Sequence, residues 1–200
     1  MANSLENEGV ASPDRNRIPT GQFVTSKMPV MSVFSPPQLD TSDWRIQIFG
    51  LVDNPSELSW QDYLALTHEE RVADFHCVTQ WTRLNIRWSG VQAMLLLGLA
   101  QPTDLARFAM LHCADGYTTN IDIEALREPD VMFVSAKDGR PLDKDHGGPV
   151  RLVVPARYGW KSAKWVTGVE LLGQDEPGFW ENNGYHMRGD PWSEERFAAY

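Results

Sequence analysis

Cysteine is scarce in this chain, with only Cys77 and Cys113 among 200 residues, which excludes a disulfide-stapled scaffold. In a reducing compartment both should be free thiols unless something binds one of them. The sequence also lacks an apolar run of about 18 residues, so we expect no membrane span. Its longest apolar stretch, Val91–Ala100, is interpreted as part of a core helix.

Positive charge is also in short supply. The chain has 18 Lys and Arg against 27 Asp and Glu, a formal net charge of -9, which argues against nucleic acid as a partner. The N-terminus does not show the basic-then-apolar order of a signal peptide, and Asn16 separates Arg15 from Arg17, so these do not form a twin-arginine signal. We therefore expect a cytoplasmic protein, or a periplasmic one if a leader was trimmed.

What the chain does contain is 42% apolar residues, enough for one compact core. Glycines and prolines interrupt residues 1–43, which should form an extended N-terminal arm over the domain. Residues 44–172 should form the domain itself. Residues 173–200 are rich in aromatic side chains without a helical or strand period, and we expect an irregular segment packed on the same domain. A contact between subunits is the alternative for this segment.

Strands should outnumber helices. A capping box at Ser59 and Asp62 predicts a short helix through Leu66, a second helix is expected over residues 91–99, and Asp115-Gly116 predicts a hairpin. Because the strands do not alternate regularly with helices, the pattern favours an α+β fold of mixed sheets with short helices over a doubly wound sheet. The expected strands cover residues 44–48, 72–78, 107–114, 117–123, 131–136, 150–154 and 164–172.

Cys77, which follows His76, is the first candidate for chemistry. A thiolate is a soft, charged ligand that suits a metal or a redox role. Zinc fits poorly, because there is no CxxC pair and adjacent His and Cys side chains do not easily reach one tetrahedral ion. A lone buried cysteine is more often a small core residue, and Cys113, inside an apolar strand, fits that alternative better than Cys77.

A second candidate spans His146–Pro155 and Gly159–Trp165. Glycines ahead of a strand allow backbone N–H groups to approach an anion, and Arg151 can pair with a phosphate through two N–H groups. Two lysines follow within a few residues. In a chain of net charge -9, this local basic cluster predicts an anion pocket, although it has neither the P-loop order nor a GxGxxG helix start. A solvated hairpin with surface cations is the alternative.

Taken together, three separated motifs resemble sulfite-oxidase-type molybdopterin enzymes. Phe75-His76-Cys77-Val78-Thr79 is similar to their cysteine-ligand region, and residues 147–155 and 161–165 are similar to their cofactor-phosphate strand and loop. The C-terminal motifs from Pro177 to Trp192 resemble compact bacterial members. The similarity runs from about Arg17 to Phe197 and implies the mixed α+β sulfite-oxidase molybdopterin-binding fold around a buried cofactor, with residues 44–172 as the catalytic domain.

Carried over position by position, the resemblance implies that Cys77 binds molybdenum beside the pterin sulfurs of a molybdenum-molybdopterin cofactor. Gln80 departs from the pattern, since many relatives have glycine there. His112, or Cys113, stands where some relatives use a hydroxyl residue. The cofactor-binding residues implied in this way are His76, His112, His146, Arg151, Lys161, Ser162 and Lys164.

The activity that the resemblance implies is oxygen-atom transfer at a small sulfur-containing substrate, as in a sulfite oxidase or dehydrogenase, with electrons exchanged with a separate haem or other electron-transfer protein. Reduction of a sulfoxide is the alternative within the family. Sulfite needs a cationic pocket, for which Arg83 is the candidate and Arg157 a weaker one, whereas a sulfoxide needs an apolar slot. A structural ion pair is the alternative for Arg83. A cofactor-free binding module, or a cofactor carrier without turnover, would be a different class of protein.

Overall fold

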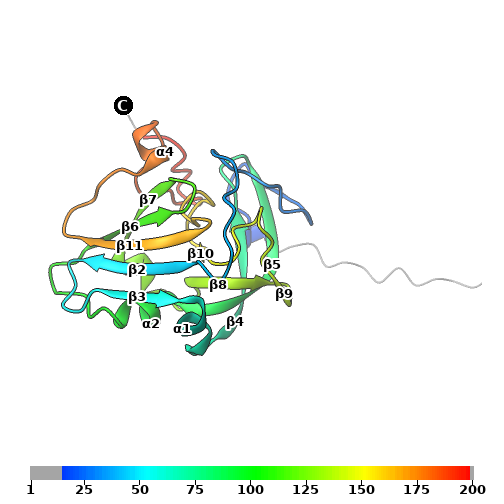
Figure 1. Cartoon of the computed structure of the whole chain (residues 1–200). Coiled ribbons are helices and arrows are strands. Elements are labelled where there is room, and N and C mark those ends of the chain that lie inside the picture. Colours follow the sequence, from blue (N-terminus) through cyan, green and yellow to red (C-terminus); the bar gives the residue numbers. More distant parts are fainter. Residues whose placement is uncertain (1–14, 199–200) are drawn as a thin grey trace, which may run out of the picture.

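A computed structural model describes residues 15–198 of the chain. Two twisted sheets and a few short helices build it (Figure 1). Most segments outside the sheets are loops, as the sequence pattern predicts. The elements in chain order are η1 Arg15–Arg17, β1 Phe23–Val24, β2 Arg45–Gly50, β3 Ser56–Ser59, α1 Trp60–Ala65, β4 Glu69–His76, β5 Trp81–Gln92, α2 Ala93–Gly98, β6 Phe108–Cys113, β7 Thr118–Asp122, α3 Ile123–Leu126, β8 Met132–Lys137, β9 Arg140–Pro141, β10 Arg151–Val153, β11 Val166–Leu172 and α4 Phe179–Asn182.

One sheet has the strand order β3-β2-β11-β6-β7. Strands β11 and β2 run parallel, and the other neighbours are antiparallel. The alternation of apolar and polar residues in β2 places Ile46 and Ile48 in the core. Trp44, just before this strand, is fully buried and donates its indole N–H to the carbonyl of Val166 at 3.0 Å.

The other sheet has the order β1-β5-β8-β10, with β4 on β5 and β9 on β8. Strand β5 is its longest strand and pairs with three others. Strand β4 ends at His76, so Cys77 begins the turn that leads into β5 at Trp81. Strand β10 lies at the other end of the sheet order and carries Arg151.

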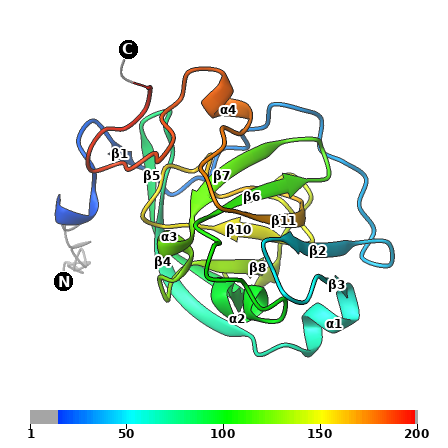
Figure 2. The same ribbon diagram turned by 90° about the vertical axis from the view of Figure 1, so that its left-hand side faces the viewer.

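The two termini of the described chain meet on one side of the molecule (Figure 2). Strand β1, drawn in blue, adds to β5 in parallel beside Trp81 and Thr82. The C-terminal segment returns to the same region, where the indole of Trp192 donates to the carbonyl of Asn16 at 3.4 Å. No helix in the range 15–198 is long and apolar enough to cross a membrane.

The expected mixed-sheet architecture with few helices is confirmed. The capping box is present: Asp62 N–H donates to Ser59 Oγ at 3.3 Å, and Ser59 N–H donates to the Asp62 carboxylate at 2.9 Å. The hairpin around Asp115-Gly116 joins β6 to β7.

Several boundaries differ from expectation, and the short strands β1, β3 and β9 were not predicted. The helix expected over 91–99 starts only at Ala93, because Val91 and Gln92 still pair with β8. The strand expected over 72–78 is β4, which ends before Cys77. Strand β5 was not predicted, because its charged residues mask the alternation of Ile86, Trp88 and Gly90, all buried.

Candidate active site

A cavity of about 260 Å³ lies beside the turn that precedes β5, and residues from distant parts of the chain line it. Cys77 lines it together with residues that lie about seventy to ninety positions later in the sequence. The predicted site residues that it collects are Cys77, His146, Arg151, Ser162 and Lys164. One cavity therefore joins the cysteine motif to the basic loop, as a single cofactor bridging both would require.

Cys77 is 7% exposed and is a free thiol at the cavity wall. Its Sγ lies 3.1 Å from the hydroxyl of Thr79. The turn that holds it is closed by two backbone bonds, Cys77 N to Trp81 O at 2.9 Å and Gln80 N to Cys77 O at 3.0 Å. Cys113 is also buried, but it belongs to β6 and does not line the cavity. Of the two thiols, only Cys77 is therefore placed to bind a group in the cavity.

Arg151 is a buried cation in the cavity wall. Its guanidinium donates to three backbone carbonyls, His146 O at 3.0 Å, Ser162 O at 2.8 Å and Leu152 O at 3.4 Å. It also lies 5.4 Å from the ring centroid of Phe75. Burial lowers its pKa to about 10, so it remains charged at neutral pH. Among the described residues it has no ion-pair partner within 4 Å.

Lys164 places a second cation in the cavity. Its Nζ donates to Ser32 Oγ at 2.6 Å and to Asp145 O at 2.9 Å. Burial, and then the charge of Arg151, lower its pKa to about 8. The two positive charges repel each other in a cavity that is partly shielded from water. An anion bound between them would stabilise the charged form of both side chains.

His146 connects this wall to the N-terminal arm. One ring nitrogen, Nε2, lies 2.9 Å from the carbonyl of Met28, and the other, Nδ1, lies 2.8 Å from the Asp143 carboxylate. Residues 28–33 of the arm line the same cavity. The arm therefore covers part of the site, and its contacts with His146 and Lys164 hold it there.

Two predicted cofactor residues lie elsewhere. His76 is 1% exposed and turns away from the cavity, with Nδ1 2.9 Å from Thr82 Oγ1. Its neighbour Cys77 faces the cavity, because side chains of adjacent residues in an extended segment point in opposite directions. His112 lies on β6 with Nε2 3.0 Å from the carboxylate of Glu170, and it does not line the cavity either.

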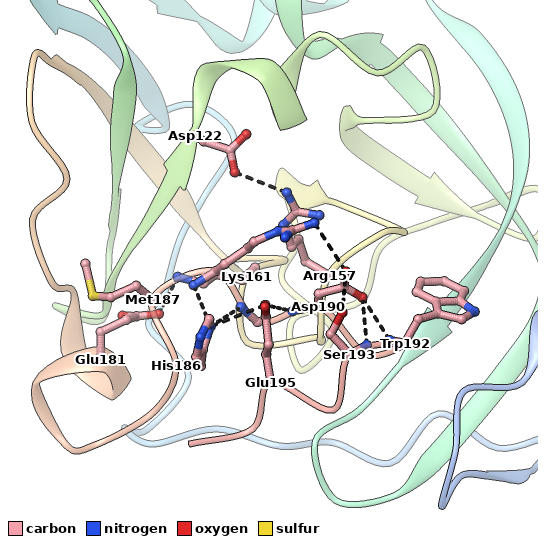
Figure 3. A network of polar contacts seen from close by, with 12 residues as sticks. Asp122, Arg157, Lys161, Glu181, His186, Met187, Asp190, Trp192, Ser193 and Glu195 are labelled. Atoms are coloured by element: carbon pink, nitrogen blue, oxygen red, sulfur yellow. Dashed lines mark hydrogen bonds and ion pairs between the residues drawn. The ribbon is translucent and has the colours of Figure 1, made fainter. Parts of the chain in front are cut away.

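Lys161 also differs from the sequence expectation. Its Nζ bonds Glu181 Oε1 at 2.6 Å and Asn120 Oδ1 at 2.6 Å, so its charge is neutralised inside the protein instead of at the cavity (Figure 3). The same Glu181 oxygen accepts the indole N–H of Trp160 at 2.8 Å. Since Trp160 lines the cavity, this buried pair supports the wall from behind.

The predicted substrate cations are paired outside the cavity. Arg83 forms an ion pair with Asp138. Arg157 forms one with Asp122 at 3.1 Å (Figure 3). Neither arginine lines the cavity. Arg83 thus forms a structural ion pair, which was the alternative to its expected role as a substrate cation.

Sequence reasoning missed the aromatic wall. Tyr185 contacts both Trp160 and Trp180, with ring centroids 5.0 Å and 4.6 Å apart. Phe75 and Trp81 stack at 5.7 Å beside them. The non-periodic aromatic residues after 173 were the available signal for part of this wall, but their position depends on tertiary packing.

These residues fit a molybdopterin cofactor. One thiolate donor faces a cavity in which two cations have no carboxylate partner within 4 Å among the described residues, which suits a soft metal at one part and a phosphate at another. The aromatic side chains that line the same cavity suit a planar ring system. The donor set thus matches all three chemical parts of such a group.

Comparison with known proteins gives the same assignment. Residues 33–180 match the oxidoreductase molybdopterin binding domain family. The chain is 41% identical over 188 residues to the uncharacterized oxidoreductase YuiH of Bacillus subtilis (strain 168), covering 94% of this chain and 95% of that protein. It is 28% identical over 184 residues to the catalytic subunit MsrP of a protein-methionine-sulfoxide reductase from Campylobacter jejuni, covering 80% of this chain and 59% of that one.

A putative protein-methionine-sulfoxide reductase subunit, YedZ1 of Azospira oryzae, is 28% identical over 152 residues, covering 76% of this chain and 58% of that protein. The chain thus spans about three fifths of these two reductase subunits. Among solved structures, the sulfane dehydrogenase SoxCD from Paracoccus pantotrophus has the same fold, with a TM-score of 0.65 at 20% identity over 87% of this chain and 56% of that one. From the family match and the 41% identical relative, we conclude that this chain belongs to the oxidoreductase molybdopterin binding domain family.

Proposed function

We propose that the chain is a molybdenum-cofactor oxidoreductase that removes the oxygen atom from a neutral sulfoxide. One observation carries this choice over sulfite oxidation. The cavity wall around Cys77 is aromatic, and the two arginines expected to hold an anionic substrate are paired with Asp138 and Asp122 outside it. An uncharged substrate with apolar substituents suits such a wall better than sulfite does.

Cys77 would supply the protein thiolate to molybdenum, while Arg151 and Lys164 would neutralise the cofactor phosphate. When bound, the cofactor supplies a metal that changes its oxidation state by two electrons and exchanges oxygen. Phe75 and Trp81 would exclude water from the side where Cys77 lies. The residues of this chain would therefore hold and orient the cofactor and exclude water from the site.

Tyr185 is the group placed to act on the substrate oxygen. It lines the cavity, and burial, followed by the charge of Cys77, raises the pKa of its phenol. A tyrosine phenol is protonated at neutral pH, and this shift keeps it so, which leaves its O–H able to donate a hydrogen bond to a sulfoxide oxygen. This bond would orient the substrate and favour the departure of its oxygen as water.

The proposed reaction consumes two electrons and two protons: R₂SO + 2 e⁻ + 2 H⁺ gives R₂S and H₂O. The electrons would come from a separate electron-transfer protein, and the protons from solvent. The two reductase relatives are themselves named as subunits, which supports a working partner for this chain.

The test is to express the full chain in a host that makes the cofactor and to measure molybdenum and pterin per chain. Turnover of an aryl methyl sulfoxide with a reduced viologen is then compared with oxidation of sulfite by ferricyanide at equal substrate concentrations. We expect about one molybdenum per chain and a clear preference for the sulfoxide. Purified, folded chain without molybdenum would refute the cofactor assignment, and a preference for sulfite would refute the substrate.

Sulfite oxidation is the second candidate, and one observation favours it. Arg151 and Lys164 bring two positive charges into the same cavity, so a charge not used by the cofactor phosphate could attract sulfite. The turnover comparison above separates the two candidates, and Arg83→Ala tests only whether the arginine that the sequence predicted for sulfite takes part. If Arg83 holds sulfite, its loss raises the KM for sulfite far more than that for a sulfoxide, whereas we expect both to stay within about two-fold because the arginine serves Asp138.

A further inference from the structure

The turn that carries Cys77, residues 77–81, adopts a conformation that its own residues do not favour. Gln80 has φ of 74°, in the left-handed region. A residue with a side chain is disfavoured there, whereas glycine is not. The two backbone bonds that close the turn are therefore formed against local strain, and contacts from elsewhere must stabilise it.

Those contacts come from the two ends of the chain. Gln22 donates its side-chain N–H to Cys77 O at 3.1 Å, and Phe23 donates its backbone N–H to Gln80 O at 2.9 Å. From the other end, Arg196 Nη1 donates to Val78 O. Three carbonyls of one short turn thus accept N–H groups from residues 22, 23 and 196, which we call the clamp.

Each side of the clamp is itself held in place. The Gln22 side-chain oxygen accepts the hydroxyl of Thr82 at 3.3 Å, and the guanidinium of Arg196 lies 4.9 Å from the ring centroid of Tyr158. Residues 22, 23 and 196 all lie outside the 33–180 segment that matches the family. The clamp therefore comes from terminal segments that lie outside the residues matched by the family model.

Arg196 is more than a structural cross-link. Its other terminal nitrogen, Nη2, is buried and has no hydrogen-bond partner within residues 15–198, and no carboxylate lies within ion-pairing distance of it there. Burying part of a cation without a counterion is unfavourable. A negatively charged thiolate–metal centre at the adjacent Cys77 would offset this cost through the carbonyl dipole that Arg196 contacts.

We infer that Gln22, Phe23 and Arg196 are positioning residues that fix the direction of Cys77 Sγ toward the bound metal. The clamp acts through the backbone of the turn, since each contact is to a carbonyl and none is to the sulfur. The metal part of this inference rests on the proposed function, whereas the ordering of the turn does not. The test therefore needs two experiments, one for the ordering of the turn and one for the metal.

The first arm uses the full chain without cofactor and measures backbone hydrogen exchange by mass spectrometry. Gln22→Ala and Arg196→Ala should speed exchange in the peptide containing residues 77–82 by roughly ten-fold, the effect of one lost charge-assisted or neutral bond at 1.4 kcal/mol per factor of ten. A peptide from β6 should not change. The matched controls are Gln47→Ala, on the exposed face of β2, and Arg188→Ala, in the same C-terminal segment but paired with Asp190.

The second arm uses the loaded enzyme. Arg196→Ala should alter the electron paramagnetic resonance spectrum of the one-electron-reduced metal and lower turnover by roughly ten-fold or more, the usual effect of losing a residue that orients a metal ligand. Arg196→Lys, which keeps a donor and a charge, should restore part of both. Gln80→Gly should reduce the loss caused by Arg196→Ala, because it removes the strain that the clamp opposes.

Each result decides the question. Unchanged exchange in residues 77–82 overturns the clamp, and faster exchange in β6 as well shows general destabilisation, which also overturns it. Local loosening together with an unaltered resonance spectrum and full turnover overturns the positioning role. A chain that lacks molybdenum in every form refutes the proposed function, yet it leaves the exchange result interpretable.

Discussion

Lys161 and Glu181 form an ion pair in the interior, with 2.6 Å between Nζ and Oε1 and side chains that are 1% and 0% exposed. Burial lowers the pKa of Lys161, and the charge of Glu181 opposes that shift. The pair joins the loop that carries Trp160 and Ser162, both in the cavity wall, to helix α4. The shape of the cavity therefore depends on a contact that lies outside it.

Glu181→Ala should destabilise the fold by about 3–5 kcal/mol, because it leaves the Lys161 charge buried without a carboxylate to neutralise it. Urea denaturation of the cofactor-free chain measures this. The matched control is Glu124→Ala, which removes a glutamate that is 86% exposed and paired with Arg127, and which should change the free energy of unfolding by less than about 0.5 kcal/mol. Equal effects of the two substitutions would show that the buried pair contributes no more than a surface pair.

Cys77→Ser should leave a folded chain that has lost the metal's protein ligand. Losing residues around a metal ligand costs 10–100-fold, so we expect loss of the ligand itself to lower turnover by more than about 100-fold, with molybdenum per chain reduced. Cys113→Ser is the matched control, because that thiol is equally buried in β6 but faces away from the cavity. Retained turnover in Cys77→Ser would remove Cys77 from the metal.

The parts of the structure that could be predicted are those encoded by local chemistry or by a continuous motif. The capping box at Ser59 and the turn at Asp115-Gly116 depend on a few adjacent residues, and both are present. The placement of Cys77, Arg151 and Lys164 around one cavity followed from the family resemblance. Sequence separation hides such a relationship, since no local pattern shows which loops will meet.

The remaining differences arise from which way a side chain points. His76 and Lys161 belong to the right motifs, but each points away from the cavity while its neighbour Cys77 or Ser162 faces it. Motif membership does not specify that direction, which depends on the local backbone and on the buried partner of each side chain, Thr82 for His76 and Glu181 for Lys161. Tyr185 was not predicted as a site residue, because only the packing of the C-terminal segment on Trp160 and Trp180 brings it to the cavity.

Retention of the cofactor should depend on pH through Lys164, whose pKa is about 8, below its ordinary 10.5. Below pH 8 the ammonium is charged and can neutralise a phosphate. Above pH 8 the free site loses this charge, and affinity should fall by up to ten-fold per pH unit until the higher pKa of the occupied site is passed. Arg151, with a pKa of about 10, stays charged through most of this window.

The measurement is the pterin that stays with the chain after dilution at pH values from about 7 to 9.5, detected by fluorescence after oxidation. Lys164→Arg should retain cofactor with little pH dependence, because its guanidinium does not titrate in this range. Lys164→Met should be weak at every pH, by roughly ten-fold for one lost charge-assisted bond. The same falling profile in all three chains would assign the pH effect to another group.

Gly159→Ala should disturb the cavity wall from within. A Cβ at this position would lie 2.5 Å from two ring carbons of Phe75, and that ring also stacks on Trp81 and contacts the guanidinium of Arg151. A stiff ring packed on three sides cannot give way cheaply, so we expect a loss of about 1–3 kcal/mol in stability. Cofactor retention should fall with it, because the displaced ring lies in the wall.

Phe75→Leu in the same chain tests this cause directly. The smaller side chain leaves room for the new methyl group, so Gly159→Ala/Phe75→Leu should be more stable than the sum of the two single changes predicts, by at least about 0.5 kcal/mol in a double-mutant cycle. Gly98→Ala serves as the control, because a Cβ there meets nothing within 4 Å and should be neutral or stabilising by up to about 1 kcal/mol. Strict additivity of the Gly159 and Phe75 changes would mean that the strain is relieved elsewhere and that Phe75 does not have to move.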